Sequence, residues 1–187
     1  MSKKINFTLI EILVAAGIIA ILAGIGFSSY SYANKSGRER TTKAVITQIS
    51  VALDSCYNKL GFYPAASEYG DIKITFEDGI PKELAFGSET FKDSDTKTQK
   101  KFFDMFAKSV DLNGLRAYCG TDGILRDSWG NPIKFKYPGN VNKNKFDMIS
   151  SGEDGKFGSG KTDAPGTDKS AYIDDAGDWI CDDIANF

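Results

Sequence analysis

A long apolar segment near the start of the chain constrains its fold more than any other feature. Between Lys4 and Lys35 the only charged residue is Glu11, and Phe7 to Phe27 is otherwise almost entirely apolar. As a helix this segment spans about 30 Å of hydrocarbon. An ionisable group inside such a span costs about 2.5 to 3.5 kcal/mol and usually has a partner. The span contains no Lys or Arg that could pair with Glu11.

The residues before the segment indicate its orientation. Lys3 and Lys4 favour a cytoplasmic N-terminus, so the rest of the chain is expected to face outward. A secretory signal peptide is the simpler alternative, but its apolar region is usually shorter and lacks a carboxylate. Removal of residues 1–6, ending at Asn6, would leave a charged amine on Phe7. That amine could meet Glu11 of a neighbouring copy and set the axial register of a helical stack.

The segment also carries a family resemblance. Phe7 to Ala15, F-T-L-I-E-I-L-V-A, follows a short basic leader and resembles the prepilin signal of bacterial type IV pilins and type II secretion pseudopilins. The resemblance implies cleavage before Phe7 by a prepilin peptidase, N-methylation of the new amine, and extraction of the helix from the inner membrane into a filament. Asn6 departs from the family pattern, which normally has Gly immediately before the cut.

Composition excludes several classes of function. The chain has 187 residues, a formal net charge of -2 and no histidine. A nearly neutral chain without a basic patch does not attract nucleic acid strongly. The absence of histidine removes every nucleophile activated by imidazole and every zinc site with a His ligand. These exclusions favour a structural role over an enzymatic one.

The chain contains 3 cysteines, Cys56, Cys119 and Cys181, at spacings too long for zinc or thiol redox motifs. Outside the cytoplasm they could form one disulfide and leave one free thiol. Cys119 with Cys181 would be the expected pair, because Cys56 falls on an apolar helix stripe. The alternative is that all act as small buried hydrophobes.

Beyond Arg38 the pattern becomes amphipathic and predicts that the helix continues to about Leu60 and ends at Gly61. The expected apolar stripe consists of Val45, Ile49, Ala52, Leu53, Cys56 and Leu60. The polar region 62–115 predicts a strand at 72–76 and a helix at 98–110, with Phe102, Phe103 and Phe106 in the core.

The C-terminal third predicts two antiparallel strands, at 133–137 and 146–150, each bounded by turn residues. The runs 127–139, 150–155 and 182–187 resemble the major pseudopilin of type II secretion systems in order and spacing. In that family the two acidic ends meet around calcium, a hard cation that takes oxygen ligands. Carried over by motif, the expected ligands are Asp154, Asp182, Asp183 and the Ser151 carbonyl. A solvated acidic loop without an ion is the alternative, and Asp163, Asp168, Asp174, Asp175 and Asp178 offer rival carboxylates.

Gly155 to Thr162, G-K-F-G-S-G-K-T, matches the P-loop pattern of nucleotide-binding proteins. A P-loop must link a strand to the N-terminus of a helix. Here Asp163 to Asp168 follow, with proline, glycine and further negative charge, and disfavour a helix. We therefore expect this match to be accidental.

These patterns and the resemblance predict an α+β pilin fold, in which a long N-terminal helix packs on a small antiparallel sheet with a C-terminal calcium loop. The expected parts are a leader (1–6), a transmembrane and polymerising half-helix (7–28), an amphipathic half-helix (29–61) and a periplasmic globular domain (62–187).

The expected function is that of a non-enzymatic pseudopilus subunit, anchored by a single pass in the inner membrane. Its implied partners are further copies of itself, minor pseudopilins, the prepilin peptidase and the inner-membrane assembly platform. The alternatives are a type IV pilus subunit and a signal-anchored periplasmic binding or hydrolytic domain.

Overall fold

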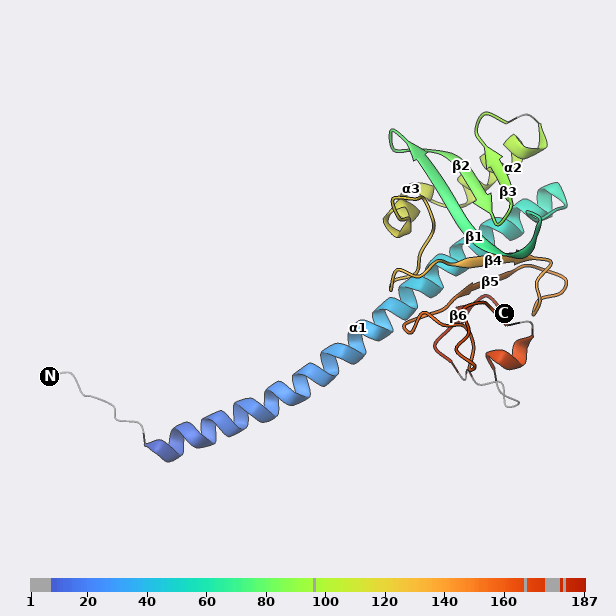
Figure 1. Ribbon diagram of the computed structural model, residues 1–187. Helices are drawn as coiled ribbons and strands as arrows, with labels where there is room; N and C mark the ends of the chain where they lie inside the picture. The colour runs from blue at the N-terminus through green and yellow to red at the C-terminus, as the bar shows by residue number, and fades with distance from the viewer. Residues whose placement is uncertain (1–7, 96, 167, 174–178, 180) are drawn as a thin grey trace. The chain divides into compact units, whose positions relative to one another are not determined.

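The computed structural model describes residues 8–95, 97–166, 168–173, 179 and 181–187 (Figure 1). The chain divides into two compact units, Met1–Gly37 and Arg38–Phe187. Helix α1 (Leu9–Leu60) contributes residues to both. The predicted leader, with Asn6 and Phe7, lies outside the described residues.

In the first unit the apolar part of α1 is exposed. The side chains of Ile10, Ile19 and Leu22 are 69%, 66% and 63% exposed. Among the described residues, α1 is the only helix long and apolar enough to cross a membrane. An apolar surface of this extent needs a cover of lipid or of other apolar helices. This part of α1 therefore has the length and the apolar surface of a helix that could cross a membrane.

In the second unit α1 carries the predicted apolar stripe. Its buried hydrophobic residues recur at helical spacing: Val45, Ile46, Ile49, Ala52, Leu53 and Cys56. Such a stripe buries one face of a helix against its own domain. α1 ends at Leu60, and Gly61 follows with a φ of 81°, a conformation that glycine adopts readily after a helix. The predicted stripe and helix end are both confirmed.

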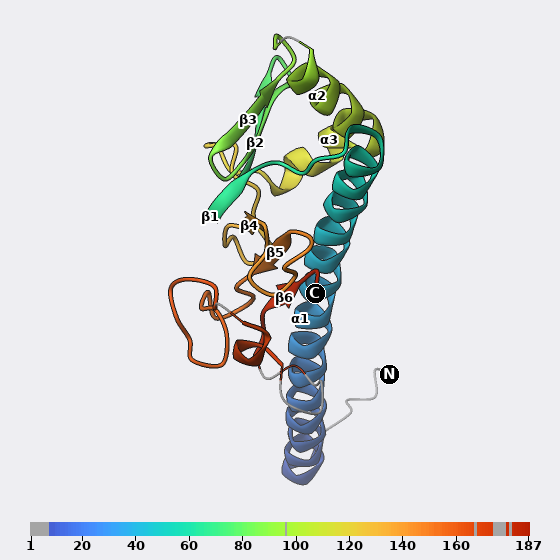
Figure 2. The same cartoon turned by 90° about the vertical axis from the view of Figure 1, so that its right-hand side faces the viewer.

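The second unit also contains an antiparallel sheet of six strands in the order β3-β2-β1-β4-β5-β6 (Figure 2). The strands are β1 (Ala66–Glu77), β2 (Ile80–Phe86), β3 (Glu89–Lys92), β4 (Lys134–Tyr137), β5 (Asp147–Ser150) and β6 (Ile184–Ala185). β4 and β5 confirm the strands predicted at 133–137 and 146–150, and β1 contains the one predicted at 72–76. β2, β3 and β6 were not anticipated.

Strand β1 lies inside the sheet and joins its two halves, β2 with β3 and β4 with β5 and β6. Its residues from Ala66 to Asp71 pair with β4, and those from Ile72 to Glu77 pair with β2. At the junction a Cβ on Gly70 would lie 2.4 Å from the Cα of Gly87. Because this contact leaves no room for a side chain, glycine is required there. Part of the central region 62–115 is thus continuous with the main sheet.

The remaining helices are short. α2 (Thr98–Ser109) agrees with the helix predicted at 98–110, and it buries Phe102, Phe103 and Phe106 as expected. It lies beside β3 in both views (Figures 1 and 2). The other helical segments are α3 (Leu112–Leu115), η1 (Arg116–Tyr118) and η2 (Lys169–Ala171).

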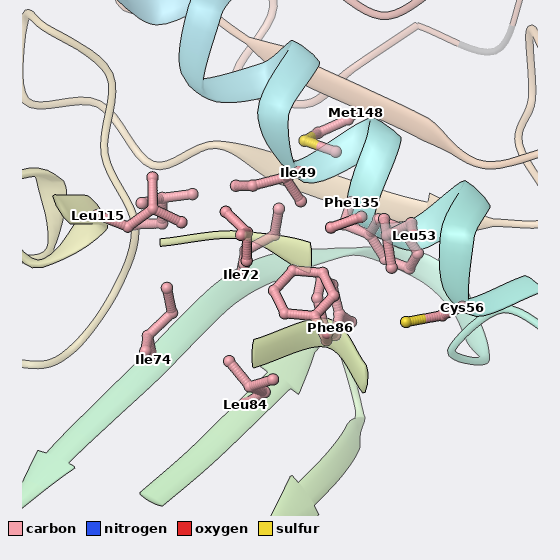
Figure 3. Close-up of a cluster of buried hydrophobic side chains, with 14 of the residues drawn as sticks. Ile49, Leu53, Cys56, Ile72, Ile74, Leu84, Phe86, Leu115, Phe135 and Met148 are labelled. Carbon is pink, nitrogen blue, oxygen red and sulfur yellow. The ribbon is translucent and has the colours of Figure 1, made fainter. Parts of the chain in front are cut away.

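The main core lies between α1 and the sheet (Figure 3). Ile49 and Leu53 of α1 are fully buried, as are Phe86 of β2 and Phe135 of β4. The rings of Phe86 and Phe135 lie 5.2 Å apart between centroids. Burial of one such side chain contributes about 1.5 to 3 kcal/mol. The amphipathic half of α1 is therefore packed on the sheet, as an α+β pilin fold requires.

A smaller core, formed by Ile149, Phe157 and Tyr172, lies under the C-terminal loop. Cys181 packs against it, whereas Cys119 packs against the main core. All three cysteines are free, so the expected Cys119–Cys181 disulfide is not formed. Of the alternative, three small buried hydrophobes, only Cys56 is fully buried, whereas Cys119 and Cys181 are half-buried beside the two cores.

Candidate functional site

The first candidate site is the start of α1, where Glu11 is bonded to Thr8. The backbone N–H and the hydroxyl of Thr8 both donate to Glu11 Oε2, each at 2.8 Å. The backbone N–H of Glu11 donates in return to Thr8 Oγ1 at 3.3 Å. This reciprocal pattern is a capping box, which the T-x-x-E spacing indicates. Glu11 therefore has a local partner, Thr8, within the single chain, although the apolar segment contains no Lys or Arg.

The helix face around Glu11 is apolar and exposed. Ile10, Val14 and Ile18 flank the acid and are 69%, 53% and 54% exposed. An acid within such a face is an unusual group for lipid to surround. Because Phe7 and Asn6 lie outside the described residues, the pairing of Glu11 with a neighbour's terminal amine stays a prediction.

The second candidate site is the C-terminal loop between β5 and β6. The two strands pair directly, with Ile149 opposite Ala185 and Ser150 opposite Ile184. This pairing brings the two ends of the loop together. The backbone N–H of Asp154 then donates to Asp182 Oδ2 at 3.0 Å. The two acidic ends of the loop therefore lie side by side, and their meeting around calcium stays a prediction.

The approach of the loop ends depends on Gly152. Its φ is 64°, in the left-handed region that side chains disfavour. A Cβ at this position would lie only 2.2 Å from the carbonyl oxygen of Asp182. Glycine is therefore required here both by backbone conformation and by the proximity of the returning chain.

A buried aspartate braces the start of the loop. Asp127 accepts hydrogen bonds from the Ser150 hydroxyl at 2.7 Å and from the backbone N–H of Asn131 at 2.8 Å. The side chain of Asn131 in turn donates to the Gly152 carbonyl at 2.8 Å. These contacts join the turn before β4 to the loop after β5. The composition of 127–132 indicated a turn but gave no signal that it would hold the loop.

Asp183 is the most unusual residue of the loop. It is 5% exposed, and its Oδ2 accepts from the Gly158 N–H at 2.6 Å. Its Oδ1 is buried and has no hydrogen-bond partner in the part of the chain that the structure describes, and Cys181 nearby offers only a weak thiol donor. Burial, reinforced by the charges of Asp182 and Asp154, raises the pKa of Asp183 to about 6. A buried carboxylate in this state is stabilised by a nearby cation.

Asp154, in contrast, already has a cation beside it. Its Oδ2 lies 2.9 Å from Lys161 Nζ, and its Oδ1 accepts from the backbone N–H of Lys156 at 2.8 Å. The Lys161 ammonium, more than the Lys156 amide, holds the pKa of Asp154 below its usual range. Two of the rival carboxylates are also engaged, Asp163 by Lys156 and Asp168 by Ser170. Asp174, Asp175 and Asp178 lie outside the described residues.

The predicted calcium ligands therefore fit the ion in chemistry. Asp154, Asp182 and Asp183 supply carboxylate oxygens, the donors that calcium prefers. Ser151, three residues before Asp154 in the sequence, is buried. Within the described ranges, no three or more His, Cys, Asp or Glu side chains are gathered so that they could hold a metal ion. The loop thus brings the donor residues to one region without arranging their side chains around one point.

The P-loop match has no nucleotide-binding structure. Phe157 and Thr162 pair across a tight turn, with N–H to carbonyl distances of 2.8 and 3.0 Å. Residues 163–166 are not helical, and the next helical segment is η2. Lys161, the lysine of the motif, pairs with Asp154. The match is accidental, as its flanking sequence indicated.

Comparison with known proteins finds similarity to one kind of secretion-system protein. Residues 107–167 match the family described as type II secretion system (T2SS), protein G. The chain is also 27% identical over 162 residues to the type II secretion system core protein G of Pseudomonas aeruginosa, an alignment that covers 87% of this chain and 92% of that relative. No solved structure is significantly similar to the chain.

Proposed function

We infer that this chain belongs to the type II secretion system protein G family, and we propose that it is a structural subunit of a pseudopilus. The observation that carries the proposal is the first unit of the chain, whose apolar helix surface is exposed around a single acid. Such a surface is stable in lipid or against copies of itself. The same helix can therefore serve as an anchor before assembly and as a core afterwards.

The proposed location is the bacterial inner membrane, with one pass through it and the globular domain in the periplasm. Lys3 and Lys4 before the apolar segment support this orientation. The proposed partners are other copies of the chain, minor pseudopilins, the prepilin peptidase and the inner-membrane assembly platform. Mass spectrometry of the purified subunit tests the processing step, because a mature chain should begin with N-methylated Phe7.

We propose a purely structural role without catalysis. The chain has no histidine to activate a nucleophile. Burial raises the pKa of the Cys56 and Cys119 thiols to about 11 and that of Cys181 to about 12. Thiols with such pKa values are protonated at neutral pH and react poorly. These observations also count against the alternative of a periplasmic hydrolytic domain.

The proposed role of Glu11 is to pair with the terminal amine of a neighbouring copy during assembly. Glu11→Ala should abolish pseudopilus formation and secretion in the native host, because the amine would be left in an apolar surrounding without a counter-charge. Glu39→Ala is the matched control, since it removes the same charge from the same helix outside the apolar segment. Immunoblots of sheared fibres and of secreted cargo provide the measurement. Wild-type assembly by the Glu11→Ala protein would refute the proposed role.

We further propose that the C-terminal loop binds calcium through Asp154, Asp182, Asp183 and the Ser151 carbonyl. The unpaired buried oxygen of Asp183 supports this proposal. In the full-length chain in detergent, a chelator should lower the melting temperature and calcium should restore it. Asp183→Asn should melt higher than the wild type in chelator, because it removes a buried charge, and should gain less from calcium. A wild-type chain whose melting is indifferent to calcium would exclude the site.

A further inference from the structure

Lys161 occupies a position in the loop that is fixed by the surrounding backbone. The pairing of Phe157 with Thr162 closes a tight turn, in which the backbone N–H of Lys161 donates to the Gly158 carbonyl at 3.0 Å. From this turn the Lys161 ammonium reaches Asp154 Oδ2 at 2.9 Å. Hydrogen bonding to Asp154, and also the charge of Asp182, raises the pKa of Lys161. The lysine is therefore a cation held at the meeting point of the loop ends.

This cation neutralises the acidic loop ends incompletely. Asp154, Asp182 and Asp183 place three carboxylates at the loop ends, where the backbone N–H of Asp154 donates to Asp182 Oδ2 at 3.0 Å. One ammonium compensates one of these carboxylates. The oxygen of Asp183 that is buried without a partner shows where compensation is missing. A divalent ion would supply both the extra charge and the coordination that an ammonium cannot give.

Lys161 and calcium would need the same ligand. An ion bound to Asp154 Oδ2 would lie close to the Lys161 ammonium, and two neighbouring cations repel each other. The side chain of Lys161 is exposed, so it can leave the site without unfolding the turn.

We propose that Lys161 is a built-in competitor for calcium, which holds Asp154 and keeps the loop closed when the ion is absent and releases Asp154 when the ion binds. The inference rests on the calcium site proposed above and adds a second, ion-free way of closing the loop. Calcium affinity is then set by the lysine as well as by the ligands.

The test is a calcium titration of the full-length chain in detergent by isothermal titration calorimetry. Lys161→Met should bind calcium about two- to fivefold more tightly than the wild type, the range expected when an exposed ion pair no longer competes. Lys169→Met is the matched control, because Lys169 is exposed in the same loop and lies outside this ion pair. It should leave the affinity unchanged. In chelator, Lys161→Met should also melt below the wild type, and saturating calcium should remove that difference.

The outcomes separate this inference from the calcium site on which it rests. If none of the three chains binds calcium, the site itself is refuted and the competition with it. If all three bind with equal affinity, the site stands and the competition is refuted. If Lys169→Met tightens binding as much as Lys161→Met, the effect is one of general charge and the specific role of Lys161 is also refuted.

Discussion

Replacing Gly152 by alanine tests whether the close approach of the loop ends stabilises the domain. A Cβ would lie 2.2 Å from the carbonyl oxygen of Asp182 and 2.8 Å from its carbonyl carbon, so the returning chain would have to move by about 1 Å to restore ordinary contact. The left-handed backbone adds about 1 to 2 kcal/mol for any residue with a side chain. The movement also breaks the bond from the Asp154 N–H to Asp182, a charged acceptor, worth about 1.5 kcal/mol at this exposed position.

The expected loss is therefore about 3 kcal/mol, or about 10 °C in melting temperature for a domain of this size. Gly61→Ala is the matched control, because Gly61 also has a left-handed backbone, whereas a Cβ added there would meet no atom within 4 Å. It should cost only about 1 kcal/mol. Circular dichroism melts of both variants, in chelator and in calcium, give the comparison. Equal losses in the two variants would show that the contact with Asp182 contributes nothing.

Two further predictions concern the core and the surface. Ile49→Ala should lower the free energy of unfolding by about 2 to 5 kcal/mol in urea titrations, because Ile49 is fully buried, whereas Val51→Ala on the exposed side of α1 should change it little. Hydrogen bonds from Lys100 and Lys82 lower the pKa of Asp93, so its contribution to stability should be present above about pH 4 and be lost as the pH falls through its lower folded pKa. Melts of Asp93→Asn and wild type should therefore differ at pH 6 and converge at strongly acidic pH, and a constant difference would contradict this.

The elements predicted from the sequence are those whose burial follows a regular period. Ile49 and Leu53 lie on a stripe with helical spacing, and Phe135 alternates with polar neighbours in β4, so burial patterns revealed both elements. β2 was missed because Pro81, Lys82 and Glu83 lie in its first half, where the pattern indicates a loop. β2 forms because β1 and β3 pair with its two edges. These pairings join segments of the folded chain, and the local sequence pattern of β2 does not specify them.

The candidate site divides in the same way. Glu11 and the acidic loop ends were located from motifs, because each lies in a short stretch of sequence that resembles a known motif. The brace from Asp127 to Ser150 and the pairing of Lys161 with Asp154 were not foreseen. Both depend on how turns place side chains, and neither residue type nor spacing specifies that geometry.

The two edge strands of the sheet, β3 and β6, are short. β3 has 4 residues and β6 has 2, and Lys92 of β3 is bound to Glu83 of β2 across the edge at 3.2 Å. Short, charged edges make poor templates for strand addition by another molecule. Copies of the chain held side by side would therefore have little tendency to merge their sheets into one.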